Sequence, residues 1–126
     1  MTKQIIQTER APAPIGPYSQ AIKTGNLLFV SGQVAFIPGT NDLANASISE
    51  EAHQVLKNIK AILAEANMNF ANIVKTTIFL SDMSLFSQVN DIYATYFEGA
   101  FPARETVAVK GLPKNANVEI SVIAAD

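Results

Sequence analysis

The sequence contains no cysteine and only one histidine, His53. Without cysteine the chain cannot form disulfide bonds, thiolate metal sites or cysteine nucleophiles. A single histidine excludes histidine clusters and leaves little room for hydrolytic triads that use an imidazole base. His53 falls beside the apolar stripe of a predicted helix, so we expect a solvated side chain without a catalytic role. Much of ordinary hydrolytic and metal-dependent catalysis is therefore excluded.

Charged residues are scarce, at 16% of the 126 residues, where about 25% is usual. The chain has nine Lys and Arg residues and eleven Asp and Glu residues, so it has no excess of basic residues for binding a nucleic-acid backbone. The mean hydropathy is nevertheless positive, at +0.18. A surface this poor in charge indicates that another subunit covers part of it, so we expect a homo-oligomer.

Long apolar runs are also missing. None approaches the roughly 20 residues that a membrane-spanning helix needs, and the polar residues 1–10 lack the apolar core of a secretory signal. These features predict a cytoplasmic protein without a membrane partner. The chain has no repeat or low-complexity tract, and we interpret residues 1–126 as one domain.

The first half predicts a hairpin followed by a long helix. Apolar runs at 19–23 and 27–31 flank a turn at Thr24-Gly25-Asn26, and a further strand is possible near Ile5. Residues 38–46 are small and polar, as in an exposed loop. Helical spacing then begins after a capping box formed by Ser47 and Glu50, and it continues through Ala66 to a left-handed stop at Asn67.

The second half repeats the alternation of strand and helix. Residues 73–80 alternate as a strand with one inner face, formed by Val74, Thr76, Ile78 and Leu80. Asp82 predicts the cap of a helix reaching about Phe97. Residues 105–110 and 118–124 predict two final strands, and residues 111–117 look locally like a hairpin loop. Together the elements predict an α+β fold with one sheet and two helices on one face, whose other face needs a partner.

Two charged residues are candidate site residues because of their positions in the chain. Arg104 follows Phe101-Pro102-Ala103, where a constrained loop enters a strand, and a guanidinium there could bind a substrate carboxylate through two parallel hydrogen bonds. Taken alone, a salt bridge is the commoner role. Glu119 stands inside an apolar strand and is either on the solvated face, as we would expect without other information, or buried for a reason. Tyr18, after a stiff Gly-Pro turn, and Ser31, at a strand end, place hydroxyl groups where sites are often built.

Taken together, five short segments resemble the RidA (YjgF) family of enamine and imine deaminases. Each is a common turn or strand motif by itself, but all five occur in the family's order and spacing across essentially the whole chain: residues 13–21 (APIGPYSQA), 28–33 (LFVSGQ), 101–104 (FPAR), 111–114 (GLPK) and 118–120 (VEI). The resemblance implies a chorismate-mutase-like fold that forms a homotrimer, with the sheets facing inward and active sites at the subunit interfaces. It also implies that the final strand lies between earlier strands, against the local hairpin interpretation.

The resemblance further implies roles for individual residues. Arg104 would bind the substrate carboxylate with the backbone N–H of Thr106, and Glu119 would hold the attacking water. The family's pocket positions correspond to Tyr18, Ser31 and Asn90, with Pro113 shaping the wall. One departure is Glu105, where the family often has Ser or Thr; alternation along a strand should direct its carboxylate away from Arg104.

The implied reaction is hydrolysis of 2-aminoacrylate and related enamines, through their 2-imino tautomers such as 2-iminopropanoate and 2-iminobutanoate, to 2-keto acids and ammonia. Such a reaction would clear reactive by-products of pyridoxal-phosphate enzymes. It needs no cofactor in this protein, because an imine carbon is already electrophilic and requires neither a metal nor a covalent nucleophile. Either Glu119 or the substrate's own carboxylate could transfer the proton.

Two other functions remain open from the sequence. The same cleft could bind a keto acid or amino-acid derivative in a regulatory trimer that has no turnover. A ribonuclease activity, attributed to some relatives, has little physical basis here because the chain is net negative, at -2, and has no basic stripe.

Overall fold

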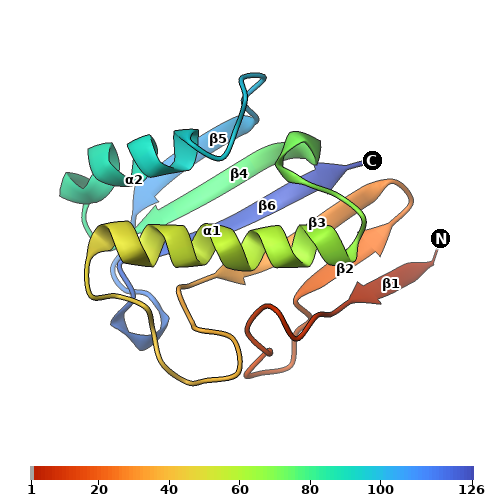
Figure 1. The fold of residues 1–126 in the computed structure, drawn as a ribbon, viewed down its shortest axis with the longest axis horizontal. Coiled ribbons are helices and arrows are strands. Elements are labelled where there is room, and N and C mark those ends of the chain that lie inside the picture. The colour runs from red at the N-terminus through yellow and green to blue at the C-terminus, as the bar shows by residue number, and fades with distance from the viewer. Residues whose placement is uncertain (1) are drawn as a thin grey trace.

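A single mixed β-sheet organises residues 2–126, the part of the chain that the computed structural model describes (Figure 1). Within these residues the sheet has six strands: β1 (Lys3–Ile6), β2 (Ala21–Thr24), β3 (Leu27–Gln33), β4 (Ile73–Leu80), β5 (Ala103–Ala108) and β6 (Val118–Ala125). Two α-helices, α1 (Ile48–Glu65) and α2 (Phe86–Ala94), accompany it. Short 3-10 turns precede β4, α2 and β6, at Phe70–Asn72 (η1), Met83–Leu85 (η2) and Pro113–Asn115 (η3). The α+β class predicted from the sequence is confirmed.

The strands lie in the order β1-β2-β3-β6-β4-β5. Only β4 and β5 are parallel, since α2 carries the chain from one to the other, and all the other neighbours are antiparallel. The local hairpin interpretation of the last two strands is therefore wrong. β6 lies inside the sheet between β3 and β4, and four of its side chains are buried there. β5 is largely exposed, as expected for a strand at the sheet edge.

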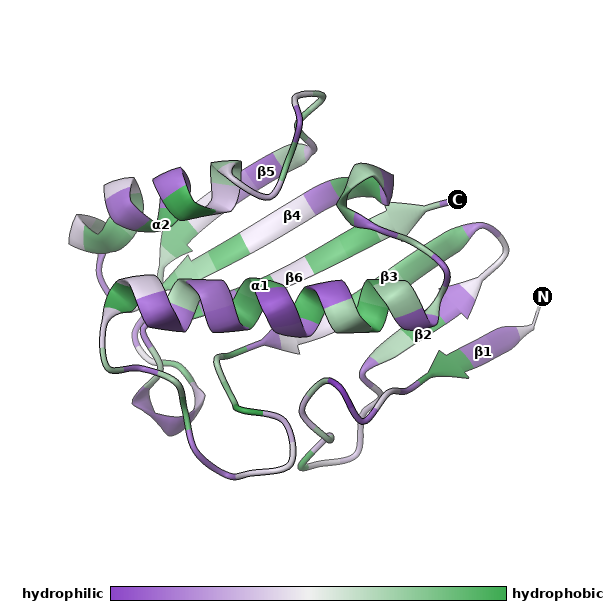
Figure 2. Cartoon of the chain, viewed as in Figure 1, coloured by the Kyte–Doolittle hydropathy of each residue, from purple (hydrophilic) through white to green (hydrophobic). Residues whose placement is uncertain are grey.

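Both helices pack on the same face of the sheet (Figure 1). The outward side of α1 carries the hydrophilic residues, and the strands beneath it are mainly hydrophobic (Figure 2). The core lies between these layers, where Leu56, Ile59 and Leu63 of α1 are at most 1% exposed and meet Ile78 and Ile120 of the sheet. This burial of one helix face and one sheet face is the main stabilising contribution expected for such a fold.

The predicted ends of α1 are confirmed. The backbone N–H of Glu50 donates a 3.0 Å hydrogen bond to Ser47 Oγ, which caps the helix. After the helix, Asn67 adopts a left-handed conformation with φ of 59°. Asparagine tolerates this region better than most residues, so the chain turns here toward β4.

Two details of the second half differ from the prediction. Val74 is not on the inner face of β4 but is 49% exposed, because Ile73 pairs with Ala124 and Lys75 already pairs with Ile123. Val74 is therefore the extra residue of a β-bulge, which alternation alone cannot reveal. Asp82 caps η2 rather than α2, through a 2.8 Å hydrogen bond from the N–H of Ser84, and α2 ends at Ala94.

The other sheet face is not covered by any helix of residues 2–126. Several large apolar side chains on its strands are consequently exposed: Ile5 (60%), Leu27 (36%), Phe29 (42%) and Val107 (43%). Large apolar side chains exposed on one face often mark an interaction surface. In the described residues, no helix has the length and hydrophobicity needed to cross a membrane.

Candidate active site

Arg104 lies at the second position of β5, directly after the Phe101-Pro102 loop. Its strand partner is Thr76 of β4, which is fully buried on the helix-covered face, so Arg104 points to that face as well. The guanidinium lies over the rings of Tyr93 and Phe86 of α2, at 5.0 Å and 5.7 Å from their centroids. These cation–π contacts hold the guanidinium in place without neutralising it.

Tyr93 supports Arg104 from below and is itself fixed. Its hydroxyl donates a 2.9 Å hydrogen bond to Thr76 Oγ1 inside the core. Burial raises the pKa of Tyr93, an effect that outweighs the opposing influences of the hydrogen bond and of the Arg104 charge. The sequence placed Tyr93 only in the apolar stripe of its helix, and nothing in the stripe distinguished this residue as the platform for an arginine.

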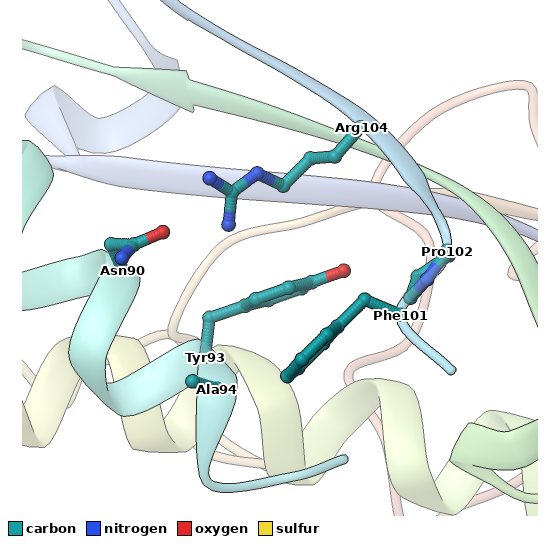
Figure 3. A pocket seen from close by; sticks show the side chains of 6 residues that line it. All are labelled: Asn90, Tyr93, Ala94, Phe101, Pro102 and Arg104. Atoms are coloured by element: carbon teal, nitrogen blue, oxygen red, sulfur yellow. The ribbon is translucent and has the colours of Figure 1, made fainter. Parts of the chain in front are cut away.

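A cavity of about 460 Å³ opens beside the guanidinium (Figure 3). It is lined by residues of α2 and of the segment entering β5: Asn90, Tyr93, Ala94, Phe101, Pro102 and Arg104. The Asn90 side chain extends toward the guanidinium, and Phe101, 59% exposed, forms the opposite wall (Figure 3). We call this the Arg104 cavity. It offers a fixed cation and an amide to an anionic ligand.

Thr106 is two residues further along β5 and lies on the same face as Arg104. Its hydroxyl oxygen is buried, and it has no hydrogen-bond partner among the described residues. The neighbouring Glu105 points the other way, where its carboxylate contacts Lys75 Nζ at 3.3 Å and accepts a hydrogen bond from Thr77 Oγ1. The prediction that Glu105 does not neutralise Arg104 is therefore confirmed.

Glu119 is the second residue of β6 and lies opposite Phe79 of β4. The flanking Val118 and Ile120 are buried beneath the helices, so Glu119 points to the uncovered face. It is half-buried there rather than freely solvated, and this burial raises the pKa of its carboxyl group. A carboxyl group in this setting can hold a water molecule and exchange a proton with it.

The space for the Glu119 carboxylate is provided by Gly32. A Cβ atom on Gly32 would lie 2.9 Å from Cδ of Glu119, which is closer than real Cβ atoms approach. The register between β3 and β6 shifts between Val30 and Gln33, so Gly32 sits in an irregular stretch of β3. The sequence showed Ser31-Gly32 as a strand end, but it gave no sign that the glycine accommodates a carboxylate.

Tyr18 and Ser31 lie together, and Ser31 directly precedes Gly32, the residue beside the Glu119 carboxylate. They line a cavity of about 430 Å³ with Ile22 and Phe29, whose side chains belong to the uncovered face. The hydroxyl of Ser31 donates a 2.6 Å hydrogen bond to the carbonyl of Ser19, which ties the turn before β2 to β3. Tyr18 remains 51% exposed. We call Tyr18, Ser31 and Glu119 the Glu119 cluster.

The predicted site residues thus form two groups within one chain. Arg104, Asn90 and Thr106 border the helix-covered face near β5, whereas the Glu119 cluster belongs to the uncovered face near β3 and β6. Pro113 is exposed in η3 and lines neither cavity. A single chain therefore does not bring the predicted carboxylate anchor and the predicted water-holding group to one substrate.

His53 differs from the sequence expectation of a solvated side chain. It is partly buried, and its Nδ1 atom lies 2.8 Å from the hydroxyl of Tyr96, with which it shares a hydrogen bond. The His53 ring also packs against the Tyr96 ring, which packs in turn against Phe70, so His53 has a structural role. Across residues 2–126, no group of three or more His, Cys, Asp or Glu side chains is placed to bind a metal ion.

Comparison with known proteins identifies close relatives. A family model described as Endoribonuclease L-PSP matches residues 8–126. A 2-iminobutanoate/2-iminopropanoate deaminase from Mus musculus is 47% identical over 97% of this chain and 90% of its own. The crystal structure of YyfA from Yersinia pestis, a protein of unknown function of the conserved Rid family, superposes with a TM-score of 0.96 at 52% identity. That match covers 99% of this chain and 100% of the other.

A further structure shows a ligand. TdcF of E. coli, crystallised with bound serine, matches with a TM-score of 0.93 at 36% identity over 98% of both chains. The family model matches all of the described sheet except β1, and the matched structures cover nearly the whole chain. The chain therefore belongs to the RidA (YjgF) family, to which the description Endoribonuclease L-PSP also refers.

Proposed function

We propose that this protein hydrolyses 2-imino acids and their enamine tautomers to 2-keto acids and ammonia. The observation that carries the proposal is that the Arg104 guanidinium is held in place beside a cavity without an acidic partner among residues 2–126. The guanidinium is held by two aromatic rings beside an open cavity, and no Asp or Glu of residues 2–126 lies within ion-pair distance of it. A fixed and unpaired guanidinium is suited to bidentate binding of a substrate carboxylate. The deaminase relatives and the serine-bound relative both act on or bind small amino-acid-like molecules, as their names state.

The chemistry requires few groups. In the proposed reaction, water adds to the C2 carbon of the imine and forms a carbinolamine. The nitrogen takes up a proton, the C–N bond breaks, and ammonia leaves as the C2 oxygen becomes the keto group. Arg104 and the N–H of Thr106 would hold the carboxylate, and Glu119 would orient the water and accept or return its proton. The raised pKa of Glu119 brings this carboxyl group nearer to the range in which it can do both.

We further propose that each active site is shared between two copies of the chain in a homotrimer. Arg104 and Glu119 point to opposite faces of one sheet, so one chain cannot offer both to a single substrate. The exposed apolar residues Leu27, Phe29 and Val107 give the uncovered face a surface on which another copy can pack. Packing of that kind would bring the Glu119 cluster of one copy to the Arg104 cavity of the next. Pro113, exposed beside the start of β6, would then contribute to the wall from the same side as Glu119.

The test generates 2-aminoacrylate from serine with a dehydratase and follows imine loss with and without this protein. The wild-type protein should accelerate imine loss over the uncatalysed rate, and Arg104→Ala should remove the acceleration. The matched control is Arg10→Ala, because Arg10 is the other arginine of the chain and is exposed at 3.9 Å from Glu65. It should keep the full rate. Arg104→Lys should recover only part of the activity, since lysine keeps the charge but not the planar fork.

The alternatives give different outcomes. Folded wild-type protein that binds 2-ketobutyrate without accelerating imine loss would support the regulatory ligand-binding function instead. RNA cleavage that survives extensive purification and disappears in Arg104→Ala would support the ribonuclease function. Full deaminase activity in Arg104→Ala would refute the assignment of Arg104 itself.

A further inference from the structure

A buried carboxylate lies outside the proposed chemistry, at the start of α1. Glu51 is 0% exposed, although carboxylates are almost never fully buried without partners. Its neighbour Glu50, in the same helical turn, is exposed. Core packing alone does not explain a charged group at this position, since an apolar residue would fill it at lower cost.

The partners of Glu51 all come from one short segment. Oε2 accepts hydrogen bonds from the backbone N–H groups of Asn117, at 2.6 Å, and Val118, at 3.2 Å. Oε1 accepts a third bond, at 3.0 Å, from the side-chain amide of Asn117. The first turn of α1 adds a favourable helix dipole for a negative charge. These bonds satisfy the carboxylate and attach the helix to the first residues of β6.

The same segment is held from the opposite side by the end of β4. The N–H of Ser81 donates a 2.9 Å hydrogen bond to the carbonyl of Asn117, and Ser81 Oγ lies 2.9 Å from Asn117 Oδ1. Asn117 is thus fixed between α1 and β4 through both its backbone and its side chain. We call the hydrogen bonds from Glu51 and Ser81 to this segment the clamp on Asn117. The preceding η3 turn contains two left-handed residues, Lys114 and Asn115, so we attribute the fixed position of Asn117 to the clamp rather than to the turn.

We propose that Glu51 is a positioning residue for Glu119. Glu119 is the residue directly after Val118, and its carboxylate packs against Gly32, where a Cβ atom would collide with it. A small shift at the start of β6 would move the carboxylate relative to Gly32 and to any water that it holds. Glu51 would set the position of Glu119 without touching the substrate. This inference rests on the proposed role of Glu119 in the deaminase reaction.

The variant that tests the proposal is Glu51→Gln, with Glu50→Gln as the matched control. Glutamine keeps the size of the side chain but has only one acceptor oxygen, so it can keep either the two backbone bonds of Oε2 or the Asn117 side-chain bond of Oε1, and its NH₂ group then faces an N–H donor. We expect kcat to fall about tenfold or more with KM within about twofold, because misplacement of a catalytic group affects the chemical step rather than carboxylate binding. Glu50→Gln should leave both constants unchanged.

A second readout does not depend on turnover. The pKa of the Glu119 carboxyl group, followed by carboxyl ¹³C shifts, should fall toward its usual value in Glu51→Gln, because a loosened strand start admits water. The other charged side chains on the strands of this sheet face are Lys3, beside Tyr18 and Ser31, and Lys75 and Glu105, which pair with each other at 3.3 Å; the substitution changes none of them. Glu50→Gln should not move this pKa.

The outcomes separate the possibilities. Folded Glu51→Gln with unchanged kcat and unchanged Glu119 pKa would overturn the proposal, as would a loss that arises only through KM or through dissociation of the oligomer. If Glu51→Gln does not fold, Ser81→Ala weakens the clamp from the other side and should show the same pattern with a smaller amplitude. If the wild-type protein lacks deaminase activity, the proposed function fails, and the ¹³C comparison still decides whether Glu51 positions Glu119.

Discussion

Glu119 carries a carboxyl group whose burial opposes its ionisation. The usual pKa of a glutamate is 4.5, and burial on the half-covered sheet raises the pKa of Glu119 above this value. At pH values between this usual pKa and the raised pKa of the folded state, Glu119 is more often protonated in the folded protein than in the unfolded chain. Stability should therefore fall as the pH rises through this window, and the loss should persist at neutral pH.

Glu119→Gln should accordingly stabilise the fold at neutral pH while impairing turnover. We expect a gain of about 0.5 kcal/mol at pH 7.5, a modest value because solvent still reaches the carboxyl group. The gain should vanish near pH 3, where Glu119 is protonated in both states. Urea unfolding at the two pH values and at equal protein concentration measures the difference. A gain of equal size at both values would contradict the stated cause.

Sequence reasoning succeeded unevenly for individual residues. The direction of Glu105 was predictable, because alternation along a strand is a local property. The partner of His53 was not, because Tyr96 is far away in the chain and meets His53 only when α2 packs beside α1. The same applies to Gly32, whose importance follows from Glu119 on a different strand.

At the scale of elements, α1 is the feature most completely predicted from the sequence. Its start, its buried stripe and its left-handed end depend on residues that are close in the chain: Ser47, Leu56, Ile59, Leu63 and Asn67. Capping by Ser47 satisfies one of the N–H groups that the first helical turn leaves without an internal partner.

Ser47→Ala should lower the free energy of unfolding by about 1 kcal/mol, since alanine cannot accept the hydrogen bond from Glu50. Ser47→Asp should keep the wild-type free energy of unfolding, because a carboxylate also caps the helix and interacts favourably with the helix dipole. Chemical denaturation of the three proteins measures both changes. Equal stability of the wild-type protein and the alanine variant would show that the cap contributes little in this fold.

Elements that depend on distant pairing were predicted less well. The bulge at Val74 exists only because β4 pairs with β6, and the sequence of β4 by itself favours regular alternation. The helix after Asp82 was expected to be continuous, but the chain first forms η2 and then α2. The strand was correct in its boundaries and wrong in the face of Val74, whereas the helix was correct in kind and wrong in its boundaries.

For the whole molecule, the main consequence of the fold is that its two candidate half-sites face opposite sides of one sheet. The Arg104 cavity lies under α2, and the Glu119 cluster lies on the uncovered face. If active sites form between copies, each site takes Arg104 from one chain and Glu119 from another.

Mixing two inactive variants tests this arrangement. Arg104→Ala and Glu119→Gln proteins, unfolded together in equal amounts and refolded, should recover about a quarter of the wild-type rate in the proposed homotrimer. About three-quarters of randomly assembled trimers are mixed, and each mixed trimer contains one intact site of three. Each variant refolded alone should stay inactive, and the rate of imine loss measures the recovery. Absence of recovery in trimers shown to be mixed would place both residues in one chain's site and refute the shared arrangement.

The sequence by itself determined the α+β class, the two helices and most strand positions, because these follow from periodicity, caps and turns within a few residues of one another. Its motifs also led to the family, which the comparisons confirm. The resemblance already implied a final strand between earlier ones, and the strand order confirms it. Only the tertiary structure decided the bulge in β4, the hydrogen bonds that hold Asn117 and the separation of Arg104 from Glu119. These features depend on which strands pair and which sheet face each side chain joins, and such contacts connect residues too far apart for any local pattern to specify.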